Sequence, residues 1–126
     1  MSKKHKKAAK DGGFFAIPKA ILNHPDFLVM SWSAQALLFH MGAFFNGFNN
    51  GDISIPHSTM KERGWCRGTL EKARQELLQK GWIIETRKGS RFFTCALYAL
   101  SWKTLNECKG KLDINPNTYA PRILKN

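Results

Sequence analysis

Apolar side chains recur at helical spacing in two stretches of the chain. In the first, Ser31 is a suitable N-cap, and the apolar residues after it share one helix face: Ala34, Leu37, Leu38, Met41, Phe44 and Phe45. In the second, which begins near Arg67 and ends at Gly81, one stripe is formed by Leu70, Ala73, Leu77 and Leu78. The pattern therefore predicts two long helices, each of which turns one apolar stripe to the core.

The segment between these helices carries the residues of turns and of one short strand. Two Asn-Gly pairs, at 46–47 and 50–51, supply the positive φ values that a helix stop and a tight turn require. Ile53 and Ile55 alternate as in a short strand, and Pro56 can begin a short helix that runs to about Arg63. Gly64-Trp65 then separates this helix from the longer one, and the order is typical of a helix-turn-helix.

The segment after the second helix and the two ends of the chain complete the expected layout. Residues 1–12 carry five Lys and predict a disordered basic arm. After this arm, Pro18 is placed to open a short helical turn and Pro25 to close it. The stretch WIIETRKGSRFFTCALYAL is rich in β-forming residues around Lys88-Gly89-Ser90, which predicts a β-hairpin with a basic tip.

We therefore expect an α+β, winged helix-turn-helix domain over residues 13–102. It would contain a three-helix core, a short strand and a two-stranded β-hairpin that forms the wing. Residues 103–126 are expected to be an irregular C-terminal tail that packs on the domain or stays partly disordered.

Four segments of the chain resemble a known group of proteins. They are IPKAILNHPDF, SWSAQALLFHMGAFFNGFNNGDIS, GWCRGTLEKARQELLQKGWI and WKTLNECKGKLDINPN, and they cover most of residues 14–117. They are similar to segments of the small winged helix-turn-helix proteins of bacterial plasmids, prophages and integrated mobile elements. The resemblance implies a winged-helix fold and DNA binding in transcriptional regulation or in plasmid replication control. The sequence departs from this group at Gly68, where many members carry a side chain that could contact a base.

Charge is the feature of the composition that bears most on function. The 126 residues include 20 Lys and Arg against 9 Asp and Glu, a net charge of +11, and the excess lies in residues 1–11, 61–91 and 92–126. Clustered basic side chains bind polyanions because they release counterions from phosphates. Three widely spaced Cys suit a reducing compartment, and no apolar run is long enough to span a bilayer. These features predict a cytoplasmic protein with a nucleic-acid partner and no contact with a membrane.

Catalytic and metal-binding patterns are not found in the sequence. It contains no P-loop spacing, no His-Glu-x-x-His and no Gly-x-Ser-x-Gly. Its four His and three Cys do not have metal-ligand spacing. We therefore expect neither an enzyme nor a cofactor, and we assign no metal site.

Three groups of residues are candidate contacts to double-stranded DNA. The N-terminal part of the second helix of such a motif enters the major groove, and its outward and flanking residues are Arg67, Thr69, Lys72 and Gln75. The wing would contact phosphates or a minor groove through Arg87, Lys88, Ser90 and Arg91. The arm would add non-specific phosphate contacts through Lys3, Lys4, Lys6, Lys7 and Lys10.

Two charge pairs are expected within the second helix of the motif. Helical geometry turns Arg74 toward the edge of the core, where its stem can pack and Glu71 can pair with its guanidinium. Lys72 and Glu76 are spaced as an i, i+4 pair. Arg74 is therefore not expected to contact DNA, although it is a basic residue of this helix.

Other partners remain open at the level of the sequence. A homodimer would pair through the helix before the motif or through the tail, and its half-sites would lie about one helical turn, roughly 34–36 Å, apart. The fold could instead hold a host or element protein, as a phage or plasmid inhibitor does. The Phe pairs at 14–15, 44–45 and 92–93 are expected in the core, but such a pair on an open sheet face could stack bases of RNA or single-stranded DNA.

Overall fold

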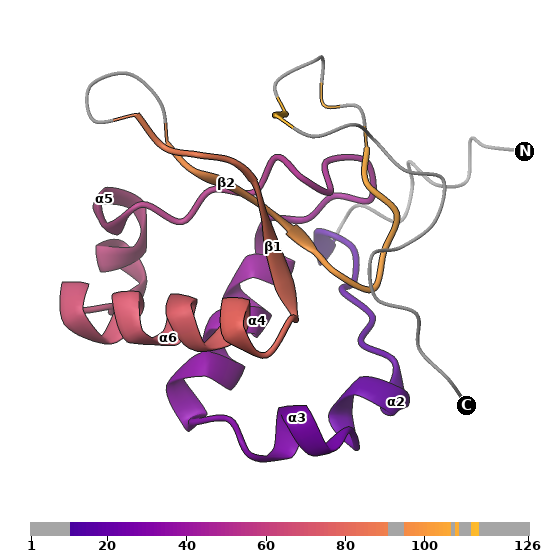
Figure 1. Cartoon of the computed structure of the whole chain (residues 1–126). Coiled ribbons are helices and arrows are strands. Elements are labelled where there is room, and N and C mark those ends of the chain that lie inside the picture. The colour runs from indigo at the N-terminus through magenta and orange to yellow at the C-terminus, as the bar shows by residue number, and fades with distance from the viewer. Residues whose placement is uncertain (1–10, 91–94, 107, 109–111, 114–126) are drawn as a thin grey trace, which may run out of the picture.

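The protein is an α+β structure of short and long helices around a small antiparallel sheet (Figure 1). The computed structural model describes residues 11–90, 95–106, 108 and 112–113. Its α-helices are α2 (Lys19–Leu22), α3 (Pro25–Leu28), α4 (Trp32–Phe44), α5 (His57–Met60) and α6 (Arg67–Gln79). A 3₁₀ helix, η2 (Lys61–Arg63), directly follows α5, and the strands are β1 (Ile83–Arg87) and β2 (Leu97–Leu100). Within the described ranges, no helix has both the length and the apolar character needed to cross a membrane.

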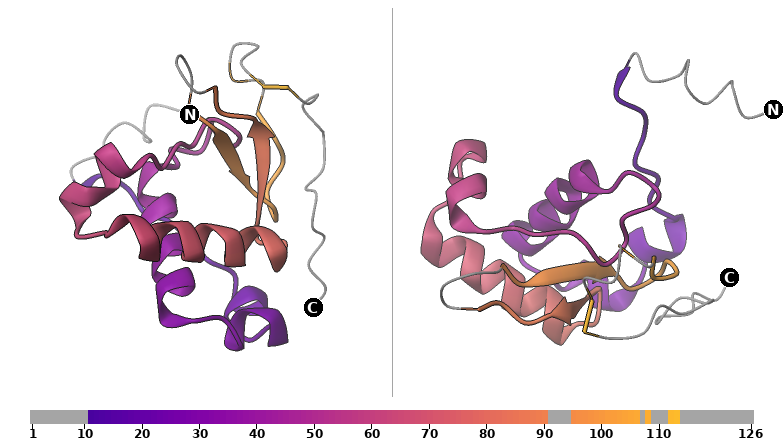
Figure 2. Two further views of the ribbon diagram at one scale, coloured as in Figure 1. Left: turned by 60° about the vertical axis from the view of Figure 1, so that its left-hand side comes forward. Right: turned by 90° about the horizontal axis from the view of Figure 1, so that it is seen from above.

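The two long helices, α4 and α6, pack against each other at the centre of the core (Figure 2). Most of the predicted stripe residues are buried, namely Ala34, Leu37, Leu38 and Met41 of α4 with Leu70, Ala73 and Leu77 of α6. Phe44, Leu78 and Phe45, which directly follows α4, are only partly buried against this core. Ser31 caps α4 as predicted, since its hydroxyl oxygen accepts a hydrogen bond from the Ala34 N–H at 3.2 Å. Both helices were therefore predicted correctly in position and in the face that they bury.

The sheet pairs β1 with β2 and contains one irregularity. Between Glu85 and Arg87 the register shifts, so that Thr86 stands as an extra residue in β1. The buried Thr86 hydroxyl donates to the carbonyl of Gly51 at 2.6 Å, which ties this strand to the loop after α4. The expected strand around Ile53 is reduced to a single antiparallel bridge between Ile53 and Tyr98. Pro56, three residues later, begins the turn into α5. The extended segment therefore ends before further strand pairs with β2 can form.

Asn50 is a buried polar residue that joins three separate parts of the chain. Its Oδ1 accepts from the Leu100 N–H at 2.7 Å. Its Nδ2 donates to the carbonyls of Leu100 at 3.0 Å, Lys103 at 3.2 Å and Thr104 at 2.9 Å. Its own backbone N–H and C=O bond to Asn106, at 2.7 and 2.9 Å. The sequence predicted only a turn here, yet this side chain holds the end of β2 and residues 103–106 on the domain.

The described start of the tail packs on the domain. Leu105 is 4% exposed, and Asp113 donates its backbone N–H to the Thr86 carbonyl at 2.8 Å. The packed structure therefore continues beyond residue 102, where the sequence placed the end of the domain.

Two expectations for the N-terminal segment are wrong. Pro25 begins α3 instead of closing a helix, because proline suits the first helical position and the His24 Nδ1 accepts from the Asp26 N–H at 3.0 Å. Phe14 is 92% exposed and not part of the core, whereas Phe15 packs against Gly42. Consecutive residues of an extended segment point to opposite sides, so only one of the pair can be buried here.

Replacement of Asn50 by alanine tests its role in stability. Asn50→Ala leaves one N–H and several carbonyls without their partner in a buried site, so we expect a loss of about 2–4 kcal/mol in the free energy of unfolding. Urea denaturation followed by circular dichroism measures this loss. Asn23→Ala is the matched control, since the exposed Asn23 amide makes one local bond to the Lys19 carbonyl and should matter by less than about 0.5 kcal/mol. Similar losses in the two variants would contradict the assigned role.

Candidate nucleic-acid interface

The outward face of α6 carries the first group of candidate contacts. All four predicted residues of this helix are exposed, namely Arg67, Thr69, Lys72 and Gln75. Cys66 occupies the N-cap without a side-chain bond to the helix, and the first turn contains no acidic residue. The first N–H groups of α6 therefore remain available to an anion at the positive end of the helix dipole. The predicted orientation of these residues is confirmed, and their contact with DNA stays a prediction.

The turn before α6 is held by side chains from both of its neighbours. Gly64 has φ +91°, which lets the chain reverse between η2 and α6. The His57 ring nitrogen Nε2 lies 3.0 Å from the Trp65 carbonyl oxygen, and the His40 and Trp65 rings meet edge to face at 5.6 Å. Arg63 lies 3.3 Å from the His40 Nδ1. The start of α6 is thereby fixed against α5 on one side and α4 on the other.

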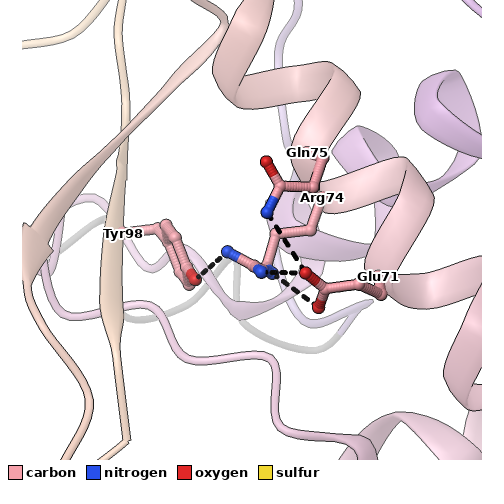
Figure 3. Close-up of polar contacts among 4 residues, drawn as sticks. All are labelled: Glu71, Arg74, Gln75 and Tyr98. Atoms are coloured by element: carbon pink, nitrogen blue, oxygen red, sulfur yellow. Dashed lines mark hydrogen bonds and ion pairs between the residues drawn. The ribbon is translucent and has the colours of Figure 1, made fainter.

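Arg74 is engaged within the protein, as its helical position predicts (Figure 3). Its guanidinium forms an ion pair with Glu71 and donates from Nη1 to the Tyr98 hydroxyl oxygen at 3.0 Å. Hydrogen bonds from Arg74 and then from Gln75 lower the pKa of Glu71 below its ordinary value. Burial raises the pKa of Tyr98, so its hydroxyl stays protonated. Arg74 therefore links α6 to β2, and most of its hydrogen-bonding capacity is used within the protein.

Among the α6 candidates in the described part of the chain, Gln75 makes a hydrogen bond through its side chain. Its Nε2 donates to the Glu71 Oε2 at 3.2 Å (Figure 3). The bond is exposed and local, so a ligand group can replace it at little cost. Glu71 thus orients two neighbours, Arg74 inward and Gln75 along the outward face.

Glu76 does not pair with Lys72, which corrects the expected i, i+4 pair. Its carboxylate accepts from the Ser31 N–H and from the Ser31 hydroxyl, each at 2.8 Å. The N-terminus of α4 has N–H groups without partners in the helix and carries the positive end of the helix dipole. It therefore attracts this carboxylate more strongly than an exposed lysine does. Lys72 therefore remains unpaired within the described structure, and Glu76 joins α6 to the start of α4.

The β-hairpin carries the second group of candidates, and these residues differ in how freely their side chains can reach a ligand. The Arg87 guanidinium donates to the Cys95 carbonyl at 2.9 Å, so it spans the hairpin instead of pointing freely outward. Lys88 and Ser90 are exposed, and the Lys88 backbone N–H donates to the Asp113 carboxylate at 3.2 Å. Lys88 is therefore the best-placed basic side chain on this part of the hairpin. Arg91 and the five lysines of the arm lie outside the described residues.

A cleft of about 250 Å³ lies between the start of α6 and the hairpin. Its lining includes Ile55 and His57 on one side, Arg67 on α6, and Cys95 and Tyr98 at the start of β2. The end of β1, the start of β2 and the start of α6 lie on the same side of the molecule in Figure 1 and in the right-hand view of Figure 2. The exposed basic residues of α6 and of the hairpin therefore border one face.

Metal ligands are not gathered on this face. In the part of the chain that the structure describes, no group of three or more His, Cys, Asp or Glu side chains converges. Cys66 and Cys95 are exposed free thiols, and Cys108 is partly buried.

Comparisons with protein-family models, with curated proteins and with solved structures find no match to this chain.

The contact between Ser31 and Glu76 is testable by a double-mutant cycle. Each of Ser31→Ala and Glu76→Ala should lower the free energy of unfolding by about 1–2 kcal/mol, and we expect a coupling of about 1 kcal/mol between them. Denaturant titration of the two single variants and the double variant measures the coupling. Lys72→Ala serves as the control and should change stability by less than about 0.5 kcal/mol. Additive effects of Ser31→Ala and Glu76→Ala would show that the two residues act independently.

We expect the stability of the protein to depend on pH through His40. Burial and the positive charge of Arg63 lower the pKa of His40 below its ordinary 6.5. As pH falls through this ordinary value, the unfolded chain binds the proton first, so the free energy of unfolding decreases. His40→Phe keeps a ring beside Trp65 but does not titrate, and it should lose less stability than the unmodified protein between about pH 7 and pH 5. Equal losses in both proteins, measured by denaturation at each pH, would contradict this assignment.

Proposed function

We propose that this chain is a winged-helix protein that binds double-stranded DNA. In this assignment α5 with η2, the turn at Gly64 and α6 form the helix-turn-helix, and β1 and β2 form the wing. The observation that carries the proposal is the outward face of α6, the second helix of the motif, whose exposed side chains are Arg67, Thr69, Lys72 and Gln75. Residues of these types pair with base edges and phosphates in the major groove.

The α6 face has the form that a duplex contact requires. Its buried side packs on α4, and its start is fixed by the contacts of the turn at Gly64 and Trp65. The outward side chains are therefore held on a rigid element. Gly68 leaves open space at the first turn of the helix. The backbone of α6 can therefore come close to the duplex at this point, with its free N–H groups toward a phosphate.

The wing and the overall charge supply the contacts that do not depend on base sequence. Lys88 is exposed and directly follows β1, whose end lies on the same side of the molecule as the start of α6 (Figure 1). A net charge of +11 favours association with any duplex and makes the affinity depend on salt. Lys88 and the lysines of the arm are therefore assigned to phosphates, and Arg67 and Gln75 to bases.

The cellular role that follows is transcriptional regulation or replication control of a mobile element, in the cytoplasm. It rests on the resemblance of the four sequence segments and on the charged face of α6. Duplex recognition of this kind needs no cofactor and no catalytic step.

The proposal predicts two distinct classes of variant. Lys88→Ala should weaken binding to all duplexes alike, since one phosphate contact is lost. The slope of the logarithm of the affinity against the logarithm of the salt concentration should become shallower by about one. Arg67→Ala and Gln75→Ala should instead change the preferred sequence, at a cost of about 1–3 kcal/mol for the duplex that the unmodified protein prefers. Selection from a random duplex library, followed by anisotropy titrations at several salt concentrations, measures both effects.

Lys19→Ala is the matched control for loss of one positive charge. Lys19 is exposed on α2, which lies far from the start of α6 (Figure 1), so its removal should leave the sequence preference and most of the affinity unchanged. Identical effects of the Lys88, Arg67 and Gln75 variants would exclude base recognition by α6. Tighter binding to unpaired strands, or no duplex binding at moderate salt, would overturn the proposal as a whole.

A further inference from the structure

The α4 helix presents a second apolar stripe on the side opposite to its buried one. It consists of Trp32, Ala36, Phe39 and Ala43, which lie within about 60° of one another around the helix at 3.6 residues per turn. Trp32 is 84% exposed and Phe39 is 46% exposed, while Ala43 is exposed and Ala36 is half-buried. Leu28 and Val29, just before α4, are also exposed, at 62% and 66%. A tryptophan exposed to this degree at the head of such a stripe indicates a surface that another molecule covers.

Charge sets this helix apart from the rest of the protein. Residues 32–44 contain no Asp, Glu, Lys or Arg, and residues 12–60 together carry one Lys and two Asp. The outer side of a surface helix normally carries polar or charged residues, whereas the outer stripe of α4 is apolar. The chain carries a net charge of +11, so two copies repel each other wherever their basic surfaces meet. The α4 stripe is a face through which two copies can approach without that repulsion.

The order of large and small residues along the stripe fits a second copy of itself. The spacings of four, three and four residues are those of the a and d positions of a coiled coil, with alanine at a and an aromatic residue at d. In an antiparallel pair centred between residues 37 and 38, Trp32 of each copy lies opposite Ala43 of the other, and Ala36 lies opposite Phe39. Each aromatic ring then meets a small side chain, so the two stripes can interlock.

We propose that two copies of this protein associate through antiparallel packing of their α4 helices along Trp32, Ala36, Phe39 and Ala43. The contact is isologous, since the same surface serves both copies. One helix stripe per copy is smaller than the roughly 800 Å² per partner of a standard stable interface. The dimer is therefore weak, and the fraction of protein in the dimer rises with protein concentration.

This interface is separate from the candidate DNA-binding face. The buried stripe of α4 faces α6, and the outer stripe lies on the other side of α4. Pairing through α4 thus leaves Arg67, Lys72 and Gln75 exposed on both copies. The proposal does not rest on duplex binding, and it selects the helix before the motif, not the tail, as the dimer contact.

Sedimentation velocity over a wide range of protein concentration tests the association. The weight-average mass should rise from the 14.3 kDa of one chain toward twice that value. Trp32→Asp should weaken the dimer by about 30-fold or more. The change removes an aromatic anchor that the dimer contact would bury, and it places a charge in that contact. Ala43→Asp changes only a small exposed residue and should have the same effect, so a folding defect at Trp32 cannot decide the result. Phe48→Asp removes another aromatic residue, 82% exposed on the loop after α4, and should leave the dimer unchanged.

Cysteine pairing tests the antiparallel arrangement. In a background with Cys66, Cys95 and Cys108 replaced by serine, Ala36→Cys and Phe39→Cys proteins of distinguishable mass are mixed and oxidised. The antiparallel pair predicts that the mixed disulfide forms in preference to either symmetric one, whereas parallel helices would give the symmetric products. A mass of 14.3 kDa at every concentration, a dimer that survives both aspartate variants, or a preference for symmetric disulfides would each overturn the proposal. Duplex affinity is measured on the same variants at concentrations where the protein is monomeric, so loss of pairing and loss of DNA binding are read separately.

Discussion

The packing of α6 on α4 is the constraint on which the rest of the structure depends. Leu70, Ala73 and Leu77 are buried against α4, and the helical repeat then directs Lys72 and Gln75 to the opposite side. The same packing buries one stripe of α4 and leaves its other stripe exposed. One helix pair therefore determines both the charged face proposed to meet DNA and the apolar face proposed to meet a second copy.

Polar side chains fix this helix pair relative to the sheet and the loops. Glu76 joins α6 to the start of α4, Arg74 joins α6 to Tyr98 on β2, and Asn50 joins the loop after α4 to the end of β2. Each contact links segments that are distant in the sequence or belong to different elements. Hydrogen bonds of this kind add modest stability, but they specify the angle at which α6 and the hairpin stand together. That angle decides whether Lys88 and Arg67 can reach the same ligand.

Local chemistry explains why much of the fold could be predicted from the sequence. Ser31 caps α4, Gly64 and Gly81 adopt the positive φ of the turns before and after α6, and the buried stripes follow the helical period. The pairing of Arg74 with Glu71 was predictable for the same reason, since three residues along a helix bring two side chains together. Where a choice depended on a distant partner, the expectations were wrong. Glu76 bonds to Ser31 instead of Lys72, and Phe14 is exposed while Phe15 is packed.

The sequence by itself determined the two long helices, the short helix before α6, the two strands of the hairpin, the order of these elements and the outward orientation of Arg67, Thr69, Lys72 and Gln75. These properties follow from residue spacing, backbone preference and charge, all of which act over a few neighbouring positions. Only the tertiary structure decided that Asn50 is a buried junction, that Arg87 spans the hairpin and that Trp32 heads an uncovered stripe. These outcomes depend on which distant segments approach one another, because burial and hydrogen-bond partners are properties of the packed chain and not of its local pattern.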